Sequence, residues 1–353
     1  METKILDVRE MTEETLRRAQ ALCEPEAMAA VDAAMEKIRE AAAVLRQGGL
    51  VAFPTETVYG LGADAFNADA AARIYEAKGR PSDNPMIVHI ARASDLSRLT
   101  TKLTPDIVRL ADEYWPGPLT MILSKREEIP ARTTGGLSTV GVRLPDSPVA
   151  IELIRLAGMP VAAPSANLSG SPSPTKAEHV IADLSGRVDV ILAGPDSSIG
   201  IESTVVDMTV DPPQVLRPGV ITADDLSQTL GRPVAADIAP ASESAAPRAP
   251  GMKYRHYAPK AEMIVIEGSQ TLVRAEISRL KLLNEQIGRH VGIMLFEERA
   301  YTEAAHDFYS MLRDMDESGV DLILAGALAA DDGLGFAVMN RMMKAAGYQI
   351  VRV

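Results

Sequence analysis

Several residue types and segments are scarce in this sequence, and their scarcity excludes whole classes of protein. Cys23 is the only cysteine among 353 residues, so the chain forms neither an intramolecular disulfide nor a cluster of thiolate metal ligands. The five histidines are dispersed without metal-ligand spacing, which argues against a transition-metal site built by the protein. No apolar run reaches the ~18 residues that a membrane span needs, and the acidic N-terminal region lacks the apolar core of a signal peptide. We therefore expect a cytoplasmic protein with no membrane partner.

Basic residues are outnumbered as well. Lys and Arg total 36 against 48 Asp and Glu, which gives a formal net charge of −12. This balance argues against a broad basic face that coats nucleic acid, but it leaves room for a local basic pocket. Aromatic residues make up only 4% of the chain, so its cores must be built from Ala, Val, Leu, Ile and Met. The length is typical of two domains.

Common nucleotide-binding and hydrolase motifs are also missing. The chain has neither a G-x-x-x-x-G-K-[ST] loop nor a G-x-S-x-G elbow. Residues 60–65 formally fit G-x-G-x-x-G/A, but these glycines do not immediately follow the expected strand and no helix clearly starts on them. The dinucleotide-binding interpretation is therefore weak.

The stretch from residue 51 to residue 90 is the most informative part of the sequence. It predicts a buried strand at 51–53, a polar loop, a helix over 69–77 and a second apolar run at 86–90. The helix runs into Lys78-Gly79-Arg80-Pro81, a typical helix stop, so we expect Lys78 and Arg80 to lie on a loop. A solvated loop is the ordinary explanation for such charges. The density of polar residues between two apolar runs favours an anion site.

The rest of the chain divides into segments of different character. Residues 1–32 predict a helical and poorly anchored leader, and alternating strands and helices up to about residue 230 predict an α/β domain. Thr175 and Glu178 have capping-box spacing, so a helix should start there. A second alternation over 262–353 predicts a small parallel sheet. Residues 232–260 are rich in Pro and Ala like a linker, yet residues 253–257 carry cations and aromatics, so we expect this segment to dock.

Scattered polar residues suggest one distributed site for a polyanion. Arg binds phosphate or carboxylate through two N–H groups, Lys acts as a point charge, and hydroxyl and amide groups add neutral hydrogen bonds. The candidates are Lys78, Arg80, Arg143, Arg217, Ser165, Asn167 and Ser173. A nucleotide with magnesium is the obvious ligand. Alternatively, Arg143 and Arg217 form surface ion pairs, Ser165 and Asn167 are turn residues, and His89 is a satisfied core histidine.

Motifs spread along the chain resemble a known family. They are PTETVYGLGADA, KGRPSDNPMIVHI, WPGPLTMIL, VGVRLPD, APSANLSG with SPSPT, ESTVVD, LRPG, APGMKYRHYAP and GLGFAVMNRMMKAAG. In this order, from about residue 36 to the end, they resemble the L-threonylcarbamoyladenylate synthase family in its two-domain form.

The resemblance implies an α/β fold: a YrdC-like twisted mixed sheet with helices, joined by a long linker to a small Rossmann-like α/β/α domain. The implied divisions are a leader (1–35), a catalytic domain (36–231), a linker that docks on the active site (232–260) and a C-terminal domain (261–353).

The resemblance also implies a reaction and its residues. ATP, L-threonine and bicarbonate or CO2 would give threonylcarbamoyl-AMP and pyrophosphate, with magnesium held by the phosphates and not by protein side chains. The product would feed a downstream tRNA threonylcarbamoyl transferase, and a weak direct contact with tRNA is left open. Lys78 and Arg80 would be catalytic. The implied ATP ligands are Arg80, Asn84, Thr139, Ser165, Asn167, Ser173, Arg217 and His256. The implied threonine ligands are Thr57, His89, Arg143, Ala163 and Ser203.

Two other functions compete with this one. The chain could be an RNA-binding module whose cations meet phosphates directly, although the net charge of −12 weighs against it. It could also be a carbamoyl-adenylating enzyme with an acceptor other than threonine.

Overall fold

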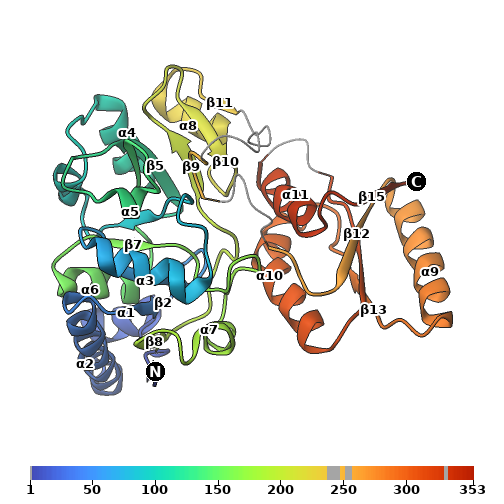
Figure 1. Ribbon diagram of the computed structural model, residues 1–353, viewed down its shortest axis with the longest axis horizontal. Coiled ribbons are helices and arrows are strands. Elements are labelled where there is room, and N and C mark those ends of the chain that lie inside the picture. Colours follow the sequence, from blue (N-terminus) through green and yellow to red (C-terminus); the bar gives the residue numbers. More distant parts are fainter. Residues whose placement is uncertain (1, 237–246, 251–256, 330–332) are drawn as a thin grey trace.

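The computed structural model describes residues 2–236, 247–250, 257–329 and 333–353, which build two separate β-sheets with their own helices (Figure 1). The larger sheet belongs to the N-terminal part of the chain and the smaller sheet to the C-terminal part. No helix within these ranges is long and apolar enough to cross a membrane.

The larger sheet is mixed and has eleven strands within the described residues. Their spatial order is β1-β8-β2-β3-β7-β4-β6-β5-β9-β10-β11. The strands are β1 (Lys4–Asp7), β2 (Val51–Phe53), β3 (Gly60–Asp64), β4 (Ile87–His89), β5 (Leu119–Ser124), β6 (Thr139–Arg143), β7 (Val161–Ala163), β8 (Val190–Ala193), β9 (Thr204–Asp207), β10 (Gln214–Arg217) and β11 (Ala235–Ala236). Parallel pairs such as β4 with β6 occur beside antiparallel pairs such as β4 with β7. The predicted mixed sheet is confirmed.

Helices cover both faces of this sheet. They are α1 (Glu13–Ala21), α2 (Pro25–Arg46), α3 (Ala68–Lys78), the 3-10 helix η1 (Ala93–Arg98), α4 (Pro105–Tyr114), α5 (Ala131–Thr134), α6 (Pro148–Ala157), α7 (Ala177–Leu184) and α8 (Ala223–Leu230).

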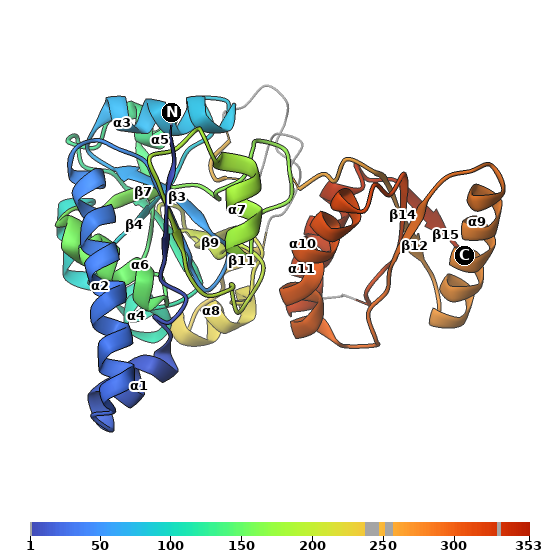
Figure 2. The ribbon, with the colours of Figure 1, turned by 90° about the horizontal axis from the view of Figure 1, so that it is seen from below.

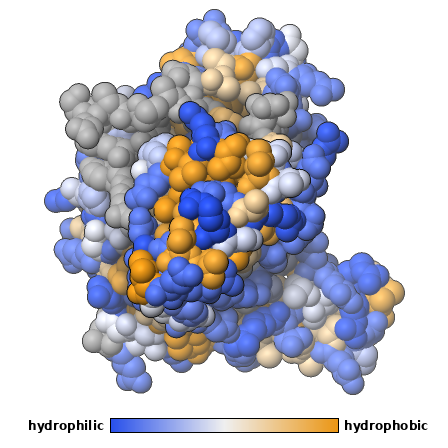
Figure 3. All heavy atoms as spheres, turned by 90° about the vertical axis from the view of Figure 1, so that its right-hand side faces the viewer, coloured by the Kyte–Doolittle hydropathy of each residue, from blue (hydrophilic) through white to orange (hydrophobic). Residues whose placement is uncertain are grey.

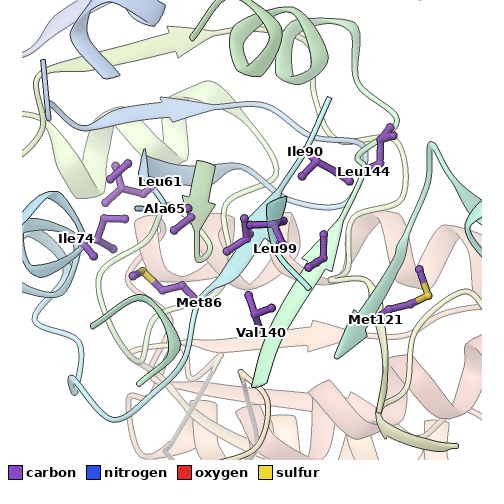
Figure 4. Packing of buried hydrophobic residues seen from close by; sticks show 14 of the residues in the cluster. Leu61, Ala65, Ile74, Met86, Ile90, Leu99, Met121, Val140 and Leu144 are labelled. Carbon is purple, nitrogen blue, oxygen red and sulfur yellow. The ribbon is translucent and has the colours of Figure 1, made fainter. Parts of the chain in front are cut away.

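Successive residues of a strand point to opposite faces, so each strand contributes to two cores. Val51 and Phe53 pack with side chains of α2 and α6. Ala52 belongs instead to the cluster that contains side chains of α3, α4 and α7. Figure 4 shows part of this second cluster, including Leu61 and Ile74. Apolar side chains on both faces thus make β2 and its neighbours a fixed frame for the loops at their ends.

The prediction of a poorly anchored leader is wrong. Strand β1 pairs in parallel with β8, and Leu6 is buried in one core beside Ile38 of α2. Pro25 does not interrupt this region, because it occupies the first turn of α2, where proline lacks only an N–H that would have no helical partner. The boundary expected at residue 36 therefore falls inside α2. A strand of four residues is too short to show a clear periodicity.

The helix expected to start at Thr175 starts slightly later. Lys176 is the N-cap of α7, and no side chain caps the helix there. The backbone N–H of Thr175 donates instead to Nδ1 of His179 at 3.3 Å. The capping-box spacing located the helix but not its cap.

The smaller sheet is parallel, with the order β13-β14-β12-β15. Its strands are β12 (Glu262–Glu267), β13 (Val291–Met294), β14 (Leu322–Gly326) and β15 (Ile350–Arg352), and its helices are α9 (Gln270–Gln286), α10 (Tyr301–Glu317) and α11 (Gly333–Ala345). Figure 2 shows α9 on one side of the strands and α10 with α11 on the other. This arrangement confirms the small parallel sheet that the alternation of strands and helices predicts, and the Rossmann-like domain that the resemblance implies.

The two parts of the chain are in contact through α10. Arg313 of α10 forms an ion pair with Asp183 of α7 at 2.8 Å, and both side chains are largely buried. Loop residues Val58 and Ile201 of the larger part lie in the core cluster of the smaller part. Gly200 has φ of +85°, and a Cβ there would lie 2.4 Å from the carbonyl oxygen of Ala305, so only glycine fits this close approach.

We predict that β1 contributes to the stability of the larger part. Leu6→Ala should lower its free energy of unfolding by about 2 kcal/mol or more, because a buried side chain is lost. Ile5→Ala is the matched control: Ile5 is 47% exposed, against 7% for Leu6, and should cost about 0.5 kcal/mol or less. Urea unfolding followed by the fluorescence of Trp115, the only tryptophan, measures both. Equally small losses of unfolding free energy for Leu6→Ala and Ile5→Ala would contradict the anchoring role of β1.

Candidate functional site

Loops and strand ends of the larger sheet surround a cavity of about 590 Å³, counted with its open mouth. Its polar lining residues come from distant parts of the sequence: Thr55, Thr57, Arg80, His89, Arg143, Ser165, Glu202, Ser203, Arg217 and Tyr257. Ala163 and Pro250 also line it. Most residues of the predicted site are therefore brought together in one place.

One side of the cavity is organised around Arg143, at the end of β6. Its Nη1 donates to Oγ1 of Thr57 at 2.8 Å, and its Nε donates to the carbonyl oxygen of Gly117 at 3.2 Å. Thr55 fixes the neighbouring turn, since its hydroxyl donates to the carbonyl oxygen of Val58 at 2.6 Å. These contacts hold the guanidinium group rigidly against the cavity.

The third nitrogen of Arg143 faces a buried carboxylate. Nη2 lies 2.6 Å from Oε1 of Glu56 as a buried ion pair. This nitrogen is therefore already paired with a buried carboxylate. Because Arg143 also lines the cavity, a ligand carboxylate there would meet a guanidinium group that is positioned beside Glu56.

His89 lies opposite Arg143 in the parallel pair of β4 and β6. Burial and the charge of Arg143 lower the pKa of His89 to about 3, so the ring is neutral at physiological pH. Its Nδ1 is buried and has no hydrogen-bond partner among the described residues. The ring therefore lines the cavity as a neutral imidazole.

Lys78 stands behind the cavity wall and not on a loop, contrary to the expectation. It is the last residue of α3, which ends at Gly79 in the left-handed conformation, and its side chain is buried. Its ammonium group donates to the carbonyl oxygens of Ser165, at 2.5 Å, and Asn167. Burial, aided by the charge of Arg80, lowers its pKa well below the ordinary value. Lys78 therefore fixes the 165–167 loop.

Within that loop Ser165 and Asn167 have different roles. Ser165 lines the cavity, and its hydroxyl donates to Oδ1 of Asn167 at 2.5 Å. The amide nitrogen of Asn167 donates to the carbonyl oxygens of Leu168 and Ser171. Asn167 thus stabilises the loop through hydrogen bonds within it, and Ser165 is the residue of this pair that lines the cavity.

Two more guanidinium groups, those of Arg217 and Arg80, line the same cavity. Arg217 donates to the carbonyl oxygen of Ser203 at 3.0 Å and to its hydroxyl at 3.1 Å. Arg80 donates to the carbonyl oxygen of Pro85 at 3.0 Å, and its buried Nε has no acceptor among the described residues. Burial lowers the pKa of Arg80 to about 10, with a smaller contribution from Arg217, and the group stays charged at neutral pH.

Besides Asn167, four predicted ATP ligands lie off this wall or outside the described residues. Thr139 lines a smaller neighbouring hollow that also contains Pro250. Asn84 is buried, and its Oδ1 has no partner among the described residues. Ser173 donates to Oε1 of Glu202 at 2.6 Å. His256 lies outside the described residues.

The sequence prediction missed Glu202 and Tyr257 as cavity residues. Tyr257 belongs to the expected docking segment, and burial raises its pKa to about 12. Glu202 has no local signal as a cavity residue, because an acidic side chain is unexpected in a cationic site. Only its place in ESTVVD, a motif of the resemblance, pointed to it.

The fold and the cavity together define a class: a two-domain α/β protein in which buried guanidinium groups, hydroxyls and a neutral imidazole form a site for small anionic ligands. Comparisons with known proteins place the chain within this class. Residues 43–219 match the family described as "Telomere recombination", and residues 221–347 match "Threonylcarbamoyl-AMP synthase, C-terminal domain".

Relatives match over nearly their whole length. The threonylcarbamoyl-AMP synthase of Pyrococcus abyssi is 46% identical over 327 residues, which cover 90% of this chain and 96% of the relative. That of Bacillus subtilis is 47% identical over 333 residues, which cover 90% and 94%. The crystal structure of P. abyssi Sua5 complexed with L-threonine superposes with a TM-score of 0.89 at 43% identity, over 99% of this chain and 100% of that one. The chain therefore belongs to the threonylcarbamoyl-AMP synthase family, a family of nucleotidyl-transferring enzymes, in its two-domain form.

We predict that His89 makes the protein sensitive to acid. Its folded pKa of about 3 lies below the ordinary 6.5, so its contribution to stability is complete above pH 6.5 and is lost as the pH falls towards 3. His89→Gln should reduce the loss of unfolding free energy between pH 7 and pH 4 by more than about 1 kcal/mol. Urea unfolding of the wild-type protein and the variant at pH 7 and at pH 4 measures this loss of unfolding free energy. An unchanged difference between the two pH values would contradict the burial of a neutral ring.

Proposed function

We propose that the cavity binds ATP beside L-threonine and that the protein joins them with bicarbonate, or with dissolved CO2, to give threonylcarbamoyl-AMP and pyrophosphate. The observation that carries this proposal is that the guanidinium groups of Arg80, Arg143 and Arg217 line one cavity together with hydroxyl groups and a neutral imidazole. We assign Arg143 with Thr57 and His89 to one subsite, and Arg80 with Ser165 and Arg217 to the other. The proposal is supported by the family and by the P. abyssi structure that contains L-threonine.

The Arg143 side suits a small amino acid. The guanidinium group would bind the threonine carboxylate, while the neutral ring of His89 and the hydroxyls of Thr57 and Ser203 would meet its polar groups. The backbone of Ala163, which also lines the cavity, would add a further hydrogen bond. Because His89 is neutral, it can accept a hydrogen bond from a substrate hydroxyl as well as donate one.

The Arg80 side suits phosphates. Arg80, Ser165 and Arg217 would bind the triphosphate directly, and Asn84, Thr139 and His256 would contribute to the rest of the nucleotide. We assign Lys78, Asn167 and Ser173 to positions behind the wall, because their hydrogen bonds are made within the protein. Lys78 would still add positive potential to the phosphate subsite.

Magnesium would enter with the ATP phosphates. The carboxylate that lines the cavity, Glu202, is bound by Ser173, Tyr309 and Arg341. Among the described residues, no group of three or more His, Cys, Asp or Glu side chains could hold a metal ion. The metal would therefore be ligated by phosphate oxygens and water.

The chemistry requires positioning and charge screening more than a nucleophilic side chain. The threonine amine, after losing a proton to solvent, forms an N–C bond to CO2, and a second proton leaves the nitrogen to give the carbamate anion. An oxygen of the resulting carbamate then attacks the α-phosphorus, and the bond to pyrophosphate breaks. Two anions must approach each other in this step, so fixed guanidinium groups lower its barrier. The product would pass to a downstream enzyme that modifies adenosine next to the tRNA anticodon.

The direct test is one reaction mixture of ATP, magnesium, bicarbonate and L-threonine, analysed by mass for the mixed anhydride. We expect threonylcarbamoyl-AMP only when threonine is present. Another amino acid giving the adenylate equally well would favour a different acceptor. Tight, strongly salt-dependent tRNA binding without any adenylate would favour an RNA-binding module instead.

Two substitutions should separate the subsites. Arg80→Ala should raise KM for ATP about 10- to 100-fold, because a charge-assisted hydrogen bond is lost, and should change KM for threonine much less. Arg143→Lys should raise KM for threonine and should change KM for ATP much less. Arg92→Ala is the control, since that side chain is 71% exposed and lies outside the cavity. Equal effects of Arg80→Ala and Arg143→Lys on both substrates would contradict the assignment.

A further inference from the structure

The smaller domain reaches into the wall of the cavity through two buried side chains. Tyr309 of α10 and Arg341 of α11 are each fully buried, and both contact Glu202. The hydroxyl of Tyr309 lies 2.9 and 3.0 Å from the two carboxylate oxygens of Glu202. Nε of Arg341 lies 3.1 Å from Oε2. The carboxylate that lines the cavity is thus held mainly from the other domain.

Arg341 also holds the backbone on both sides of the cavity wall. Its Nη2 donates to the carbonyl oxygen of Glu202 at 3.3 Å, and its Nη1 donates to that of Pro218. Glu202 directly precedes Ser203, and Pro218 directly follows Arg217. One guanidinium group of the smaller domain therefore holds the residues adjacent to Ser203 and Arg217. Ser203 and Arg217 in turn hydrogen-bond each other in the cavity wall.

Charges alternate through this network. Arg341 lies behind Glu202, and Arg217 lies on its cavity side. Burial by itself raises the pKa of Glu202, but Arg341 and Arg217, together with the hydrogen bond from Ser173, hold it below its ordinary value. Glu202 is therefore a carboxylate at neutral pH, and its charge offsets part of the cost of burying Arg217. Tyr309 adds a packing contact, since its ring centroid lies 5.4 Å from that of Tyr257 in the cavity wall.

We propose that Tyr309 and Arg341 are positioning residues of the active site, which hold Ser203 and Arg217 in place through Glu202 and Pro218. The inference rests on the proposed function and adds to it that the C-terminal domain is a part of the substrate site. Tyr309 and Arg341 contact Glu202 and Pro218, the residues adjacent to Ser203 and Arg217. A domain held only by apolar packing would not need these polar contacts.

A double-mutant cycle tests this role. Tyr309→Phe removes one hydroxyl with little change in volume, and should lower kcat/KM for ATP about fivefold or more. In an Arg217→Lys background the same change should have an effect of less than about twofold, because the positioned group is already altered. In an Arg143→Lys background its full effect should remain. General loosening of the fold would reduce activity equally in all three backgrounds.

Two further variants complete the design. Tyr301→Phe is the matched control, because the Tyr301 hydroxyl bonds the carbonyl oxygen of Ala329 within the smaller domain, and it should keep wild-type kcat/KM. Arg341→Lys keeps the positive charge but loses the planar set of N–H donors. Its effect on kcat/KM should depend on Arg217 in the same way as that of Tyr309→Phe. Circular dichroism checks that each variant is folded.

The outcomes separate this inference from the proposed function. A wild-type protein that makes threonylcarbamoyl-AMP while Tyr309→Phe stays within about twofold of it would overturn the positioning role. So would an undiminished effect of Tyr309→Phe in the Arg217→Lys background. If the wild-type protein makes no adenylate, the proposed function fails. The same cycle, run on ATP affinity by calorimetry, then still decides the positioning role.

Discussion

Burying four cationic side chains around one cavity is the constraint on which this structure depends. A buried charge is costly unless it is paired or well hydrogen-bonded. The contacts that meet Lys78, Arg80 and Arg217 are largely carbonyl and hydroxyl oxygens, which satisfy the N–H groups without cancelling the charge. Positive potential therefore remains for a ligand, and a bound anion would supply the missing counter-charge. The site is poised for anions because the fold neutralises it incompletely.

The sheet explains how residues far apart in the sequence reach this cavity. Short strands buried on both faces form a rigid frame, and the polar residues follow at strand ends and in the loops between them. The second domain then completes the frame, because α10 and α11 contact the loops at 58 and 199–203 that no strand of the first sheet holds. A chain with net charge −12 can thus hold a local cationic site.

Much of this could be predicted from the sequence, and the failures have physical causes. Arg80, Arg143 and Arg217 line the cavity, and their roles as ligand-binding residues stay predictions. The helix predicted over 69–77 ends one residue too early. Lys78 is the last helical residue of α3, and Gly79 is the residue that caps it. Glu202 was missed, because its partners Tyr309 and Arg341 lie more than 100 residues further on. Long-range contacts of this kind leave no local pattern.

The most direct test of the central claim is a crystal structure with L-threonine and a non-hydrolysable ATP analogue. The account predicts phosphate oxygens within hydrogen-bond distance of Arg80, Ser165 and Arg217, and the amino-acid carboxylate on Arg143. A nucleotide bound elsewhere, with these guanidinium groups still contacting only protein oxygens, would contradict it.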